Sequence, residues 1–371
     1  MTNPILKALQ VEDFKCFEQL RVPLASLTVL SGYNGAGIST ALQPILLLAQ
    51  AARRRTWSSE AATGDLPLNG AIVRLGSAGD VIRGQSVDAT ARFKLFGDEK
   101  LLALNATGRT GARSLTVTKS EGSDDWPELS NCLARLVYLS AVRGGPAEYF
   151  PTPDRVSDQT PDVGVDGQFA SYWYHELADS EIDPARRCPD EPSTMFRKQI
   201  DAWLSRLAPN AKANVQSFPI ASVQALEFAL SEVNEWRRPA NVGYGLTYAF
   251  PILVALLAAE PDGIVVIDSP EAHLHPQAQS QMGRLLAVFA AAGIQVIVET
   301  HSDHVLNGIR LAVRDHVLAA VDLSLLFFAG SSQDGHGVTS PRIDGEGRIS
   351  EWPEGFFDQG DKDIAQLAGW S

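Results

Sequence analysis

One short stretch near the N-terminus constrains the fold of this chain more than any other. Residues 27–30 are apolar on both faces and predict a buried strand, which runs directly into a glycine-rich loop at residues 32–37. Residues 39–53 then predict a helix. The successive N–H groups of such a loop form a concave nest, and the helix N-terminus adds partial positive charge. The unit therefore predicts an anion-binding loop at the start of an α/β domain.

The loop reads GYNGAGIST and departs at one position from the usual phosphate-loop pattern G-x-x-x-x-G-K-[ST]. Gly32 and Gly37 have the required spacing, and Gly35 adds a further point where the backbone can approach a phosphate. Ser39 stands where a hydroxyl normally ligates Mg²⁺, but Ile38 stands in place of the lysine. One charge-assisted hydrogen bond contributes about 1.5–3 kcal/mol to binding, and isoleucine supplies none. A glycine-rich turn unrelated to nucleotides is the alternative interpretation.

A second motif, GIVVIDSPEAHLHP, begins at Gly263. Its apolar residues predict a buried strand that ends in Asp268, where a carboxylate can hold Mg²⁺ through water. Glu271 follows shortly after, where a carboxylate can act as general base towards an attacking water. An ordinary buried strand that ends in an acidic turn would explain the same residues.

A third motif, VIVETHSDHVL, predicts another buried strand, which ends just before His301. A histidine at that place can hydrogen-bond a γ-phosphate and report its presence. His273 and His304 are better explained as structural histidines, whereas His275 is a candidate for a loop that crosses between two subunits.

A fourth motif, NVGYGLTYAFPILVAL, places a Gly-x-Gly turn before a predicted helix. The N–H groups that follow Gly243 and Gly245 can bind an anion at the helix start. Thr247 can cap this helix and offer a hydroxyl. A capped core helix without any ligand is the alternative.

Taken in this order, the four motifs resemble the ABC-type ATPases, and more closely the soluble SMC/RecF/OLD-like group. PEAHLHP, from Pro270, and ETHSDHVLNGIR, from Glu299, are phrases characteristic of that group. YLSAVRGGP, from Tyr138, and DGEGRISEWPEGFFDQ, from Asp344, resemble a subset that carries a C-terminal domain of unknown function. The resemblance covers nearly the whole chain.

The resemblance implies an α/β fold: a P-loop NTPase of the ABC ATPase head type with a mainly parallel core sheet, an antiparallel β lobe and a helical lobe. The ATPase domain would span residues 1–330, with the antiparallel lobe at about 70–120 and the helical lobe, which carries the signature, at about 190–260. Residues 331–371 would form a small appended segment. Period-two stretches over residues 72–118 favour the antiparallel lobe, and alternating strands and helices in the second half favour a parallel sheet.

The resemblance also assigns residue roles, with ATP and Mg²⁺ as cofactors. The nucleotide-binding set is Gly32, Asn34, Gly35, Ala36, Gly37, Ile38, Ser39 and Thr40, with Gly243, Gly245 and Thr247 standing in for the signature loop. Ser39 and Asp268 would hold Mg²⁺. Glu271 would be the catalytic carboxylate, and His301 the switch histidine. The departures are Ile38, which argues against efficient turnover, and a signature far from LSGGQ.

By the same resemblance, two chains would pair head to tail as a homodimer or a higher oligomer, with ATP between the phosphate loop of one chain and the signature of the other. The implied function is an ATP-dependent switch that controls an effector such as a nuclease or toxin, in DNA repair or anti-phage defence. The formal charge of -13 disfavours a broad DNA-binding surface, so any DNA contact would use a partner or a local basic patch.

Three other functions fit parts of the sequence. A non-hydrolysing, nucleotide-gated scaffold or regulatory subunit is favoured by Ile38 and opposed by Glu271 and His301. The missing LSGGQ and the distinctive C-terminal tail argue against the motor subunit of a membrane transporter. A nucleotide kinase would need an acceptor lid, and no segment resembles one.

The remaining composition favours a cytoplasmic protein without a membrane partner. The longest apolar run, residues 248–259, is too short to span a bilayer, and no signal peptide is evident. Cys16, Cys132 and Cys188 include no CxxC pair and are expected to be reduced thiols.

Overall fold

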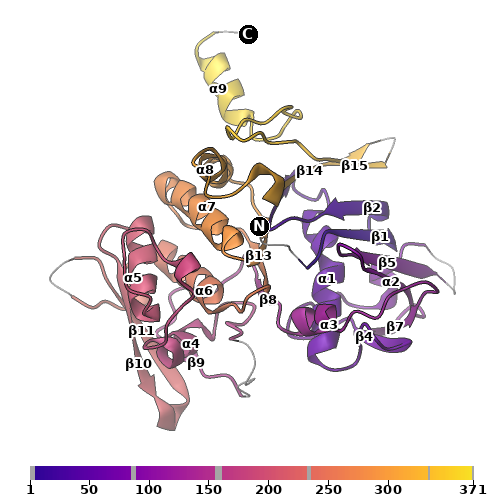
Figure 1. The fold of residues 1–371 in the computed structure, drawn as a ribbon, viewed down its shortest axis with the longest axis horizontal. Helices are drawn as coiled ribbons and strands as arrows, with labels where there is room; N and C mark the ends of the chain where they lie inside the picture. The colour runs from indigo at the N-terminus through magenta and orange to yellow at the C-terminus, as the bar shows by residue number, and fades with distance from the viewer. Residues whose placement is uncertain (1–4, 85–88, 155–160, 232–234, 333–334, 370–371) are drawn as a thin grey trace. The chain divides into compact units, whose positions relative to one another are not determined.

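The computed structural model describes residues 5–84, 89–154, 161–231, 235–332 and 335–369 (Figure 1). The chain divides into two compact units. Unit 1 comprises Val137–Ala320 and Gly345–Gly347, and unit 2 comprises Asn3–Leu136, Val321–Asp344 and Arg348–Ser371.

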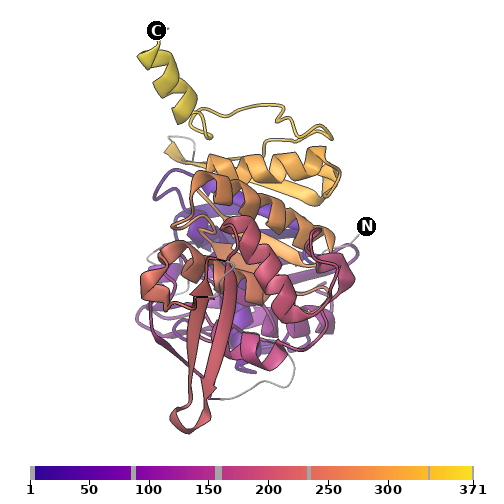
Figure 2. The same cartoon turned by 90° about the vertical axis from the view of Figure 1, so that its left-hand side faces the viewer.

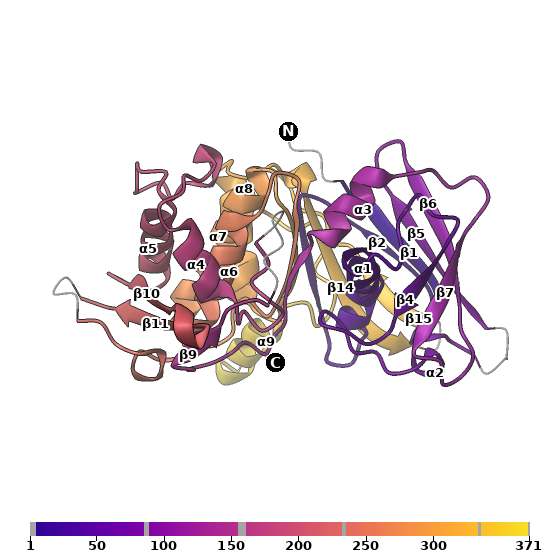
Figure 3. The same ribbon diagram turned by 90° about the horizontal axis from the view of Figure 1, so that it is seen from below.

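Unit 2 contains a six-stranded antiparallel sheet, labelled at the right of Figure 3. Its strand order is β2–β1–β5–β6–β7–β4. The bounds are β1 Ala8–Phe14, β2 Phe17–Pro23, β4 Thr63–Pro67, β5 Thr90–Phe96, β6 Leu101–Thr107 and β7 Ser114–Lys119. Buried side chains alternate with more exposed ones along β5, β6 and β7, because one face of the sheet packs on a core. An antiparallel lobe is therefore present, as the period-two pattern of residues 72–118 predicted, but β1, β2 and β4 of the same sheet lie outside that range.

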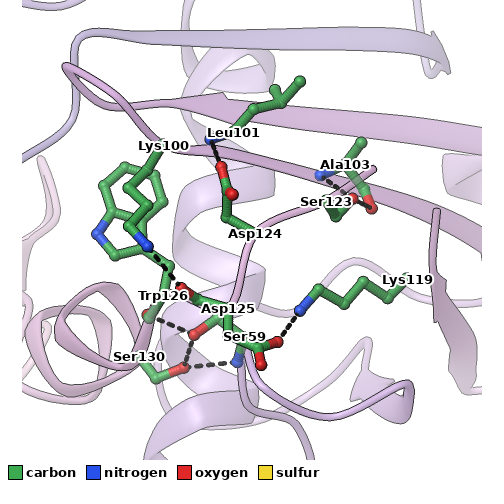
Figure 4. A network of polar contacts seen from close by, with 10 residues as sticks. All are labelled: Ser59, Lys100, Leu101, Ala103, Lys119, Ser123, Asp124, Asp125, Trp126 and Ser130. Atoms are coloured by element: carbon green, nitrogen blue, oxygen red, sulfur yellow. Dashed lines mark hydrogen bonds and ion pairs between the residues drawn. The ribbon is translucent and has the colours of Figure 1, made fainter. Parts of the chain in front are cut away.

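A hydrogen-bond network ties the segment after β7 to this sheet and to helix α3, Pro127–Ala134 (Figure 4). The Ser123 hydroxyl accepts from the Ala103 N–H and donates to the Ala103 carbonyl, both at 3.0 Å. Asp124 accepts from the Leu101 N–H at 2.7 Å. The remaining members are Ser59, Lys100, Lys119, Asp125, Trp126 and Ser130. Because most of these bonds involve a backbone group, the network fixes the path of the chain.

The other part of unit 2 is built around strand β3, Leu27–Gly32, and helix α1, Ile38–Arg53. Strand β14, Leu323–Ser332, pairs with β3 in parallel and with β15, Gly335–Thr339, antiparallel. Most of α1 is buried, because its own apolar residues lie on nearly every side of the helix. Two short helices complete the unit: α2, Ala78–Val81, and α9, Gln359–Leu367.

Unit 1 contains three parallel strands in the order β13–β12–β8. They are β8 Val137–Leu139, β12 Ile264–Asp268 and β13 Gln295–Glu299. Helix α6, Tyr244–Ala258, leads into β12, helix α7, Pro276–Ala291, follows β12, and helix α8, Asp303–Arg314, follows β13. Helices α7 and α8 lie side by side (Figure 1). None of the described helices, including the very apolar α6, has the length and hydropathy needed to cross a membrane.

A second layer of unit 1 carries a three-stranded antiparallel sheet of order β10–β11–β9. Its strands are β9 Tyr149–Pro151, β10 Lys212–Phe218 and β11 Val223–Ala229, and the β10–β11 hairpin extends as a long ribbon (Figure 2). Helices α4, Ala170–Leu177, and α5, Phe196–Leu207, pack beside it. The sequence over residues 151–190 is rich in Pro, Asp and Gly, which predicts one long ordered loop. This prediction is wrong at α4, because buried Trp173 and Tyr174 anchor a helix there.

A half-buried carboxylate in α5 provides a test of this packing. Asp201 accepts a hydrogen bond from the Ala213 N–H at 3.0 Å, and burial raises its pKa from 3.8 to about 6. A pKa raised by folding contributes stability that is present below about pH 4 and is lost as the pH rises through about 6. Asp201→Asn keeps an acceptor and removes the charge, so we expect it to raise the free energy of unfolding at neutral pH by about 1–2 kcal/mol.

Urea unfolding at about pH 4 and at neutral pH measures this effect. The stabilisation should be present at neutral pH and absent at the acid end. Glu176→Gln, which changes an exposed carboxylate of α4, is the matched control and should change neither value. A loss of stability in Asp201→Asn at neutral pH contradicts the assignment.

Candidate functional site

The loop between β3 and α1 is held in shape by close packing against β14. A Cβ added at Gly32 would lie 2.3 Å from the Phe328 carbonyl oxygen, so only glycine fits there. The same carbonyl accepts the Tyr33 N–H at 3.0 Å, and the Ala36 N–H donates to the Tyr33 carbonyl at 3.0 Å. These contacts fix the first half of the loop.

The second half of the loop rests on the turn between β1 and β2. Gly37 precedes α1 with a left-handed φ of 97°, and a Cβ there would lie 2.6 Å from the Phe17 ring and 3.0 Å from the Cys16 sulfur. Gly35 also has a positive φ, 77°, in open space. Both conformations favour glycine, which explains the spacing seen in the sequence.

The side chains of the loop divide into buried and exposed sets. Ile38 is the first residue of α1, and its side chain is only 4% exposed. Asn34 and Ser39 are exposed, whereas Thr40 is half-buried. Burial raises the pKa of the Cys16 thiol, although a hydrogen bond with the Thr40 side chain opposes the shift. The loop therefore carries an aliphatic side chain, packed into the core, at the position of the usual lysine.

The C-terminal segment of the chain packs on the exposed tip of this loop. Gly355 has a φ of 83° and faces Tyr33 so closely that a Cβ would lie 1.7 Å from the phenol oxygen. The phenol donates to the Glu354 carbonyl at 3.5 Å. The Tyr33 ring meets the edge of Phe327, and Phe327 meets Phe356, with ring centroids 5.6 and 5.4 Å apart. Phe356 is 2% exposed, so the segment is anchored in the core of unit 2.

In unit 1, the acidic residues lie at the ends of two adjacent parallel strands. Strand β12 ends at Asp268, and the turn after it brings Glu271 to the end of β13. The Glu271 carboxylate accepts from the Thr300 hydroxyl at 2.7 Å and from the His301 N–H at 2.9 Å. Unit 1 thus brings together three of the predicted site residues, and two donors fix the direction of the Glu271 carboxylate.

The histidines around this strand end have different surroundings. His301 is exposed. His273 lies against two tyrosine rings of α6, and His304 lies 3.7 Å from the Asp303 carboxylate. His275 is the residue before α7, and its Nδ1 accepts the Gln277 N–H at 3.3 Å. His275 therefore caps a helix.

The Gly-x-Gly segment starts α6 earlier than the sequence suggested. The helix begins at Tyr244, and its cap is Gly243, whose φ of 83° suits glycine. The prediction that Thr247 caps the helix is wrong, because Thr247 lies inside it, 4% exposed. Its hydroxyl has no hydrogen-bond partner among the residues that the structure describes. Gly245 packs on the acidic turn, where a Cβ would lie 2.9 Å from the His273 carbonyl oxygen.

The structure groups the predicted residues within each unit. Unit 2 holds the loop set, namely Gly32, Asn34, Gly35, Ala36, Gly37, Ile38, Ser39 and Thr40. Unit 1 holds Asp268, Glu271 and His301, with Gly243 and Gly245 at the start of α6.

Arg143 is a site residue that sequence reasoning missed. It is 3% exposed and donates to the Asp268 carbonyl at 2.9 Å and to the Ser269 carbonyl at 2.6 Å. A signal was present: a lone arginine stands shortly after the buried strand β8, where a charge is costly unless it is hydrogen-bonded.

Comparison with known proteins identifies two families in the chain. Residues 27–307 match the family described as "AAA domain, putative AbiEii toxin, Type IV TA system". Residues 318–367 match a family described as "Protein of unknown function (DUF3696)". No curated protein matches the chain.

Two solved structures share the fold. One is the Smc head domain with an extended coiled coil bound to the C-terminal domain of ScpA, derived from Pyrococcus furiosus, with 12% identity and a TM-score of 0.53 over 98% of this chain and 100% of that chain. The other is the SmcHead bound to the C-winged helix domain of ScpA, with 13% identity and a TM-score of 0.51 over 92% of this chain and 98% of that chain. At these identities the likeness shows the fold alone.

The contact between Tyr33 and Gly355 generates a testable prediction. Gly355→Ala introduces a side chain that collides with the phenol and disfavours the left-handed φ, so we expect the C-terminal segment to open more often. The free energy that a left-handed φ costs alanine makes this segment open more often. We therefore expect trypsin to cleave at Arg348 and Lys362 roughly fivefold faster. Intact mass spectrometry during limited trypsin digestion measures the cleavage.

Gly360→Ala is the matched control, because a Cβ at that position meets nothing within 4 Å. It should be cut at the rate of the unaltered chain. Equal cleavage of the two variants contradicts the anchoring role given to Gly355.

The family model covers most of the chain, and the two Smc heads share its fold, so the predicted α/β fold of a P-loop NTPase head is confirmed. The chain belongs to the AAA-domain family described as "AAA domain, putative AbiEii toxin, Type IV TA system".

Proposed function

We propose that this protein binds ATP with Mg²⁺ at the loop between β3 and α1 and works as a nucleotide-dependent switch on a partner. The observation that carries the proposal is the conformation of the loop. Gly32 and Gly37 are pressed against β14 and Phe17, and the loop leads straight into the first turn of α1. Membership of an AAA family supports ATP as the ligand.

The loop fits phosphates, but with less charge than usual. The amides around Gly35 and the N-terminus of α1 supply partial positive charge, and Asn34 and Ser39 add exposed polar groups. Ile38 adds none, because its side chain is aliphatic and buried. The missing charge-assisted bond weakens ATP binding by about 1.5–3 kcal/mol, which corresponds to roughly ten- to a hundredfold in affinity.

We assign Mg²⁺ to Ser39 and Asp268, and the activation of water to Glu271. Bound Mg²⁺ would neutralise negative charge on the phosphate oxygens. Support for Asp268 comes from its place at the tip of a buried strand, and support for Glu271 comes from its two fixed donors. Glu271 would accept a proton from the attacking water. His301 would report the γ-phosphate, and its backbone N–H already bonds Glu271.

The partners follow from the same family relations. We propose a head-to-tail homodimer or higher oligomer in which the Gly243 end of α6 contacts the nucleotide held by another copy; Gly243 faces open space. The Smc heads were solved bound to parts of ScpA, which supports a protein partner for this head as well. The family description, which names a toxin–antitoxin system, favours a toxin or nuclease effector in defence or repair. DNA would be reached through that partner, and a cytoplasmic location suits these roles.

A non-hydrolysing, nucleotide-gated scaffold is the second candidate. The specific observation in its favour is Ile38, because a buried isoleucine cannot stabilise the negative charge that develops on a phosphate during hydrolysis. The two candidates share nucleotide binding and differ only in turnover.

Restoring the lysine tests the proposal. We expect the unaltered chain to bind Mg-ATP and release little phosphate, and Ile38→Lys to release phosphate roughly a hundredfold faster. Ile38→Met, which has similar length and no charge, is the matched control and should stay slow. Equilibrium ATP binding and steady-state phosphate release measure both effects.

The Glu271→Gln variant tests the catalytic role of that carboxylate, and ATP binding by the two chains tests the proposed function. Adding Glu271→Gln to the Ile38→Lys chain should abolish phosphate release and leave ATP bound. If neither the unaltered chain nor Ile38→Lys binds ATP, the proposed function is wrong. If both release phosphate at the same rate, the effect assigned to Ile38 is wrong.

A further inference from the structure

One buried arginine joins three segments of unit 1 at the acidic strand end. Arg143 is 3% exposed. Its guanidinium donates to the carbonyl oxygens of Ser140 at 2.8 Å, Asp268 at 2.9 Å and Ser269 at 2.6 Å. The planar fork of arginine suits this set of acceptors, and a lysine ammonium would not reproduce its geometry.

The charge of this arginine is costly to bury. Burial lowers the pKa of Arg143 to about 10, so the guanidinium is still protonated at neutral pH. Its Nε is buried without a hydrogen-bond partner among the residues that the structure describes. Among the residues that the structure describes, carbonyl oxygens accept the hydrogen bonds of Arg143, and no carboxylate does. A buried charge held in this way is unfavourable for stability alone, and it indicates a role in holding the turn.

The turn that Arg143 holds contains strained backbone. Ser269 has a φ of 51° and His273 a φ of 61°, both in the left-handed region. Residues other than glycine keep such conformations only where their surroundings enforce them. Arg143 bonds the Ser269 carbonyl directly. The Ser269 hydroxyl donates to Oδ1 of Asp268 at 2.8 Å, so the conformation of Ser269 bears on the direction of that carboxylate.

The first turns of α6 pack on the same turn and on the same guanidinium. The Tyr248 ring lies 5.3 Å from the Arg143 guanidinium and 4.6 Å from the His273 ring. The Tyr244 ring lies 5.2 Å from the His273 ring. Gly245 leaves no space for a side chain against the His273 carbonyl. Both strained residues of the turn are thus held, Ser269 by Arg143 and His273 by α6.

We propose that Arg143 and Tyr248 are positioning residues that couple the Gly243 end of α6 to the acidic end of β12. The inference rests on the proposed function, in which the Gly243 end of α6 meets a nucleotide and Asp268 and Glu271 serve one. A shift of this helix moves Tyr248 against the guanidinium and His273. The guanidinium, which bonds the Asp268 and Ser269 carbonyls, then moves these two groups. Nucleotide binding at one end therefore changes the binding free energy at the other end.

Hydrogen exchange without nucleotide tests the coupling directly. The N–H groups of Ala272 and Leu274 are bonded inside the turn, to Ser269 and Glu271, so their exchange reports its opening. We expect Tyr248→Leu to raise exchange over residues 268–275 roughly fivefold, and Tyr248→Phe, which keeps a ring, to leave it within about twofold. Arg143→Lys should raise it at least as much as Tyr248→Leu.

Phe250→Leu is the matched control on the same helix. Phe250 is 1% exposed and packs on Tyr174 and Phe228, away from the turn, so its loss should destabilise α6 without opening residues 268–275 selectively. If Phe250→Leu opens the turn as much as Tyr248→Leu, or if Tyr248→Leu leaves exchange unchanged, the coupling is overturned.

A second measurement separates this inference from the proposed function. In the Ile38→Lys chain, Arg143→Lys should lower kcat for phosphate release roughly tenfold while ATP affinity changes less than about twofold. An equal loss of affinity and kcat contradicts a positioning role. If neither the unaltered chain nor Ile38→Lys binds ATP, the proposed function fails, and the exchange results alone decide the coupling.

Discussion

The packing of the loop between β3 and α1 is the constraint on which the nucleotide chemistry proposed for this protein depends. Gly32 presses on the Phe328 carbonyl and Gly37 on the Phe17 ring, so the loop can take only one path into the helix. In the proposed site, the amides around Gly35 and the start of α1 form a nest for phosphate along this path. Ile38, buried at the first position of α1, removes the full charge that normally accompanies the nest. Affinity for phosphates then depends on amide dipoles and the helix dipole, which are weaker than an ammonium.

Unlike the loop, the acidic strand end of unit 1 has its charged groups, and each of them is held by hydrogen bonds. Two donors orient Glu271, and Arg143 holds the backbone of the Asp268 turn. Under the proposed function, a loop without a lysine and a Glu271 carboxylate held in place favour a protein that binds nucleotide and hydrolyses it slowly. The contact between Tyr33 and Gly355, and that between Phe327 and Phe356, show that the same loop and strand β14 also support the C-terminal segment.

Strong local patterns explain what the sequence could predict. The patterns of residues 196–207, 277–291 and 303–313 predict helices, and those of residues 264–267 and 295–298 predict buried strands, because such elements have clear periods. The structure has α5, α7, α8, β12 and β13 at these places, each to within one residue at either end. Helix α4 was missed because Pro, Asp and Gly surround its short apolar pattern. Thr247 resembles a cap, but the positive φ of Gly243 starts the helix earlier. The partners of Arg143 and of Gly355 depend on contacts between distant segments, which no local pattern records.

The most direct test of the central claim is the affinity of the unaltered chain for adenosine, AMP and ATP, with Mg²⁺ present, by equilibrium titration. If the amides around Gly35 and the start of α1 bind phosphates without a lysine, affinity should rise along this series, with ATP at least about tenfold tighter than AMP. Equal affinity for the three ligands, or no binding of any, would contradict phosphate binding at this loop.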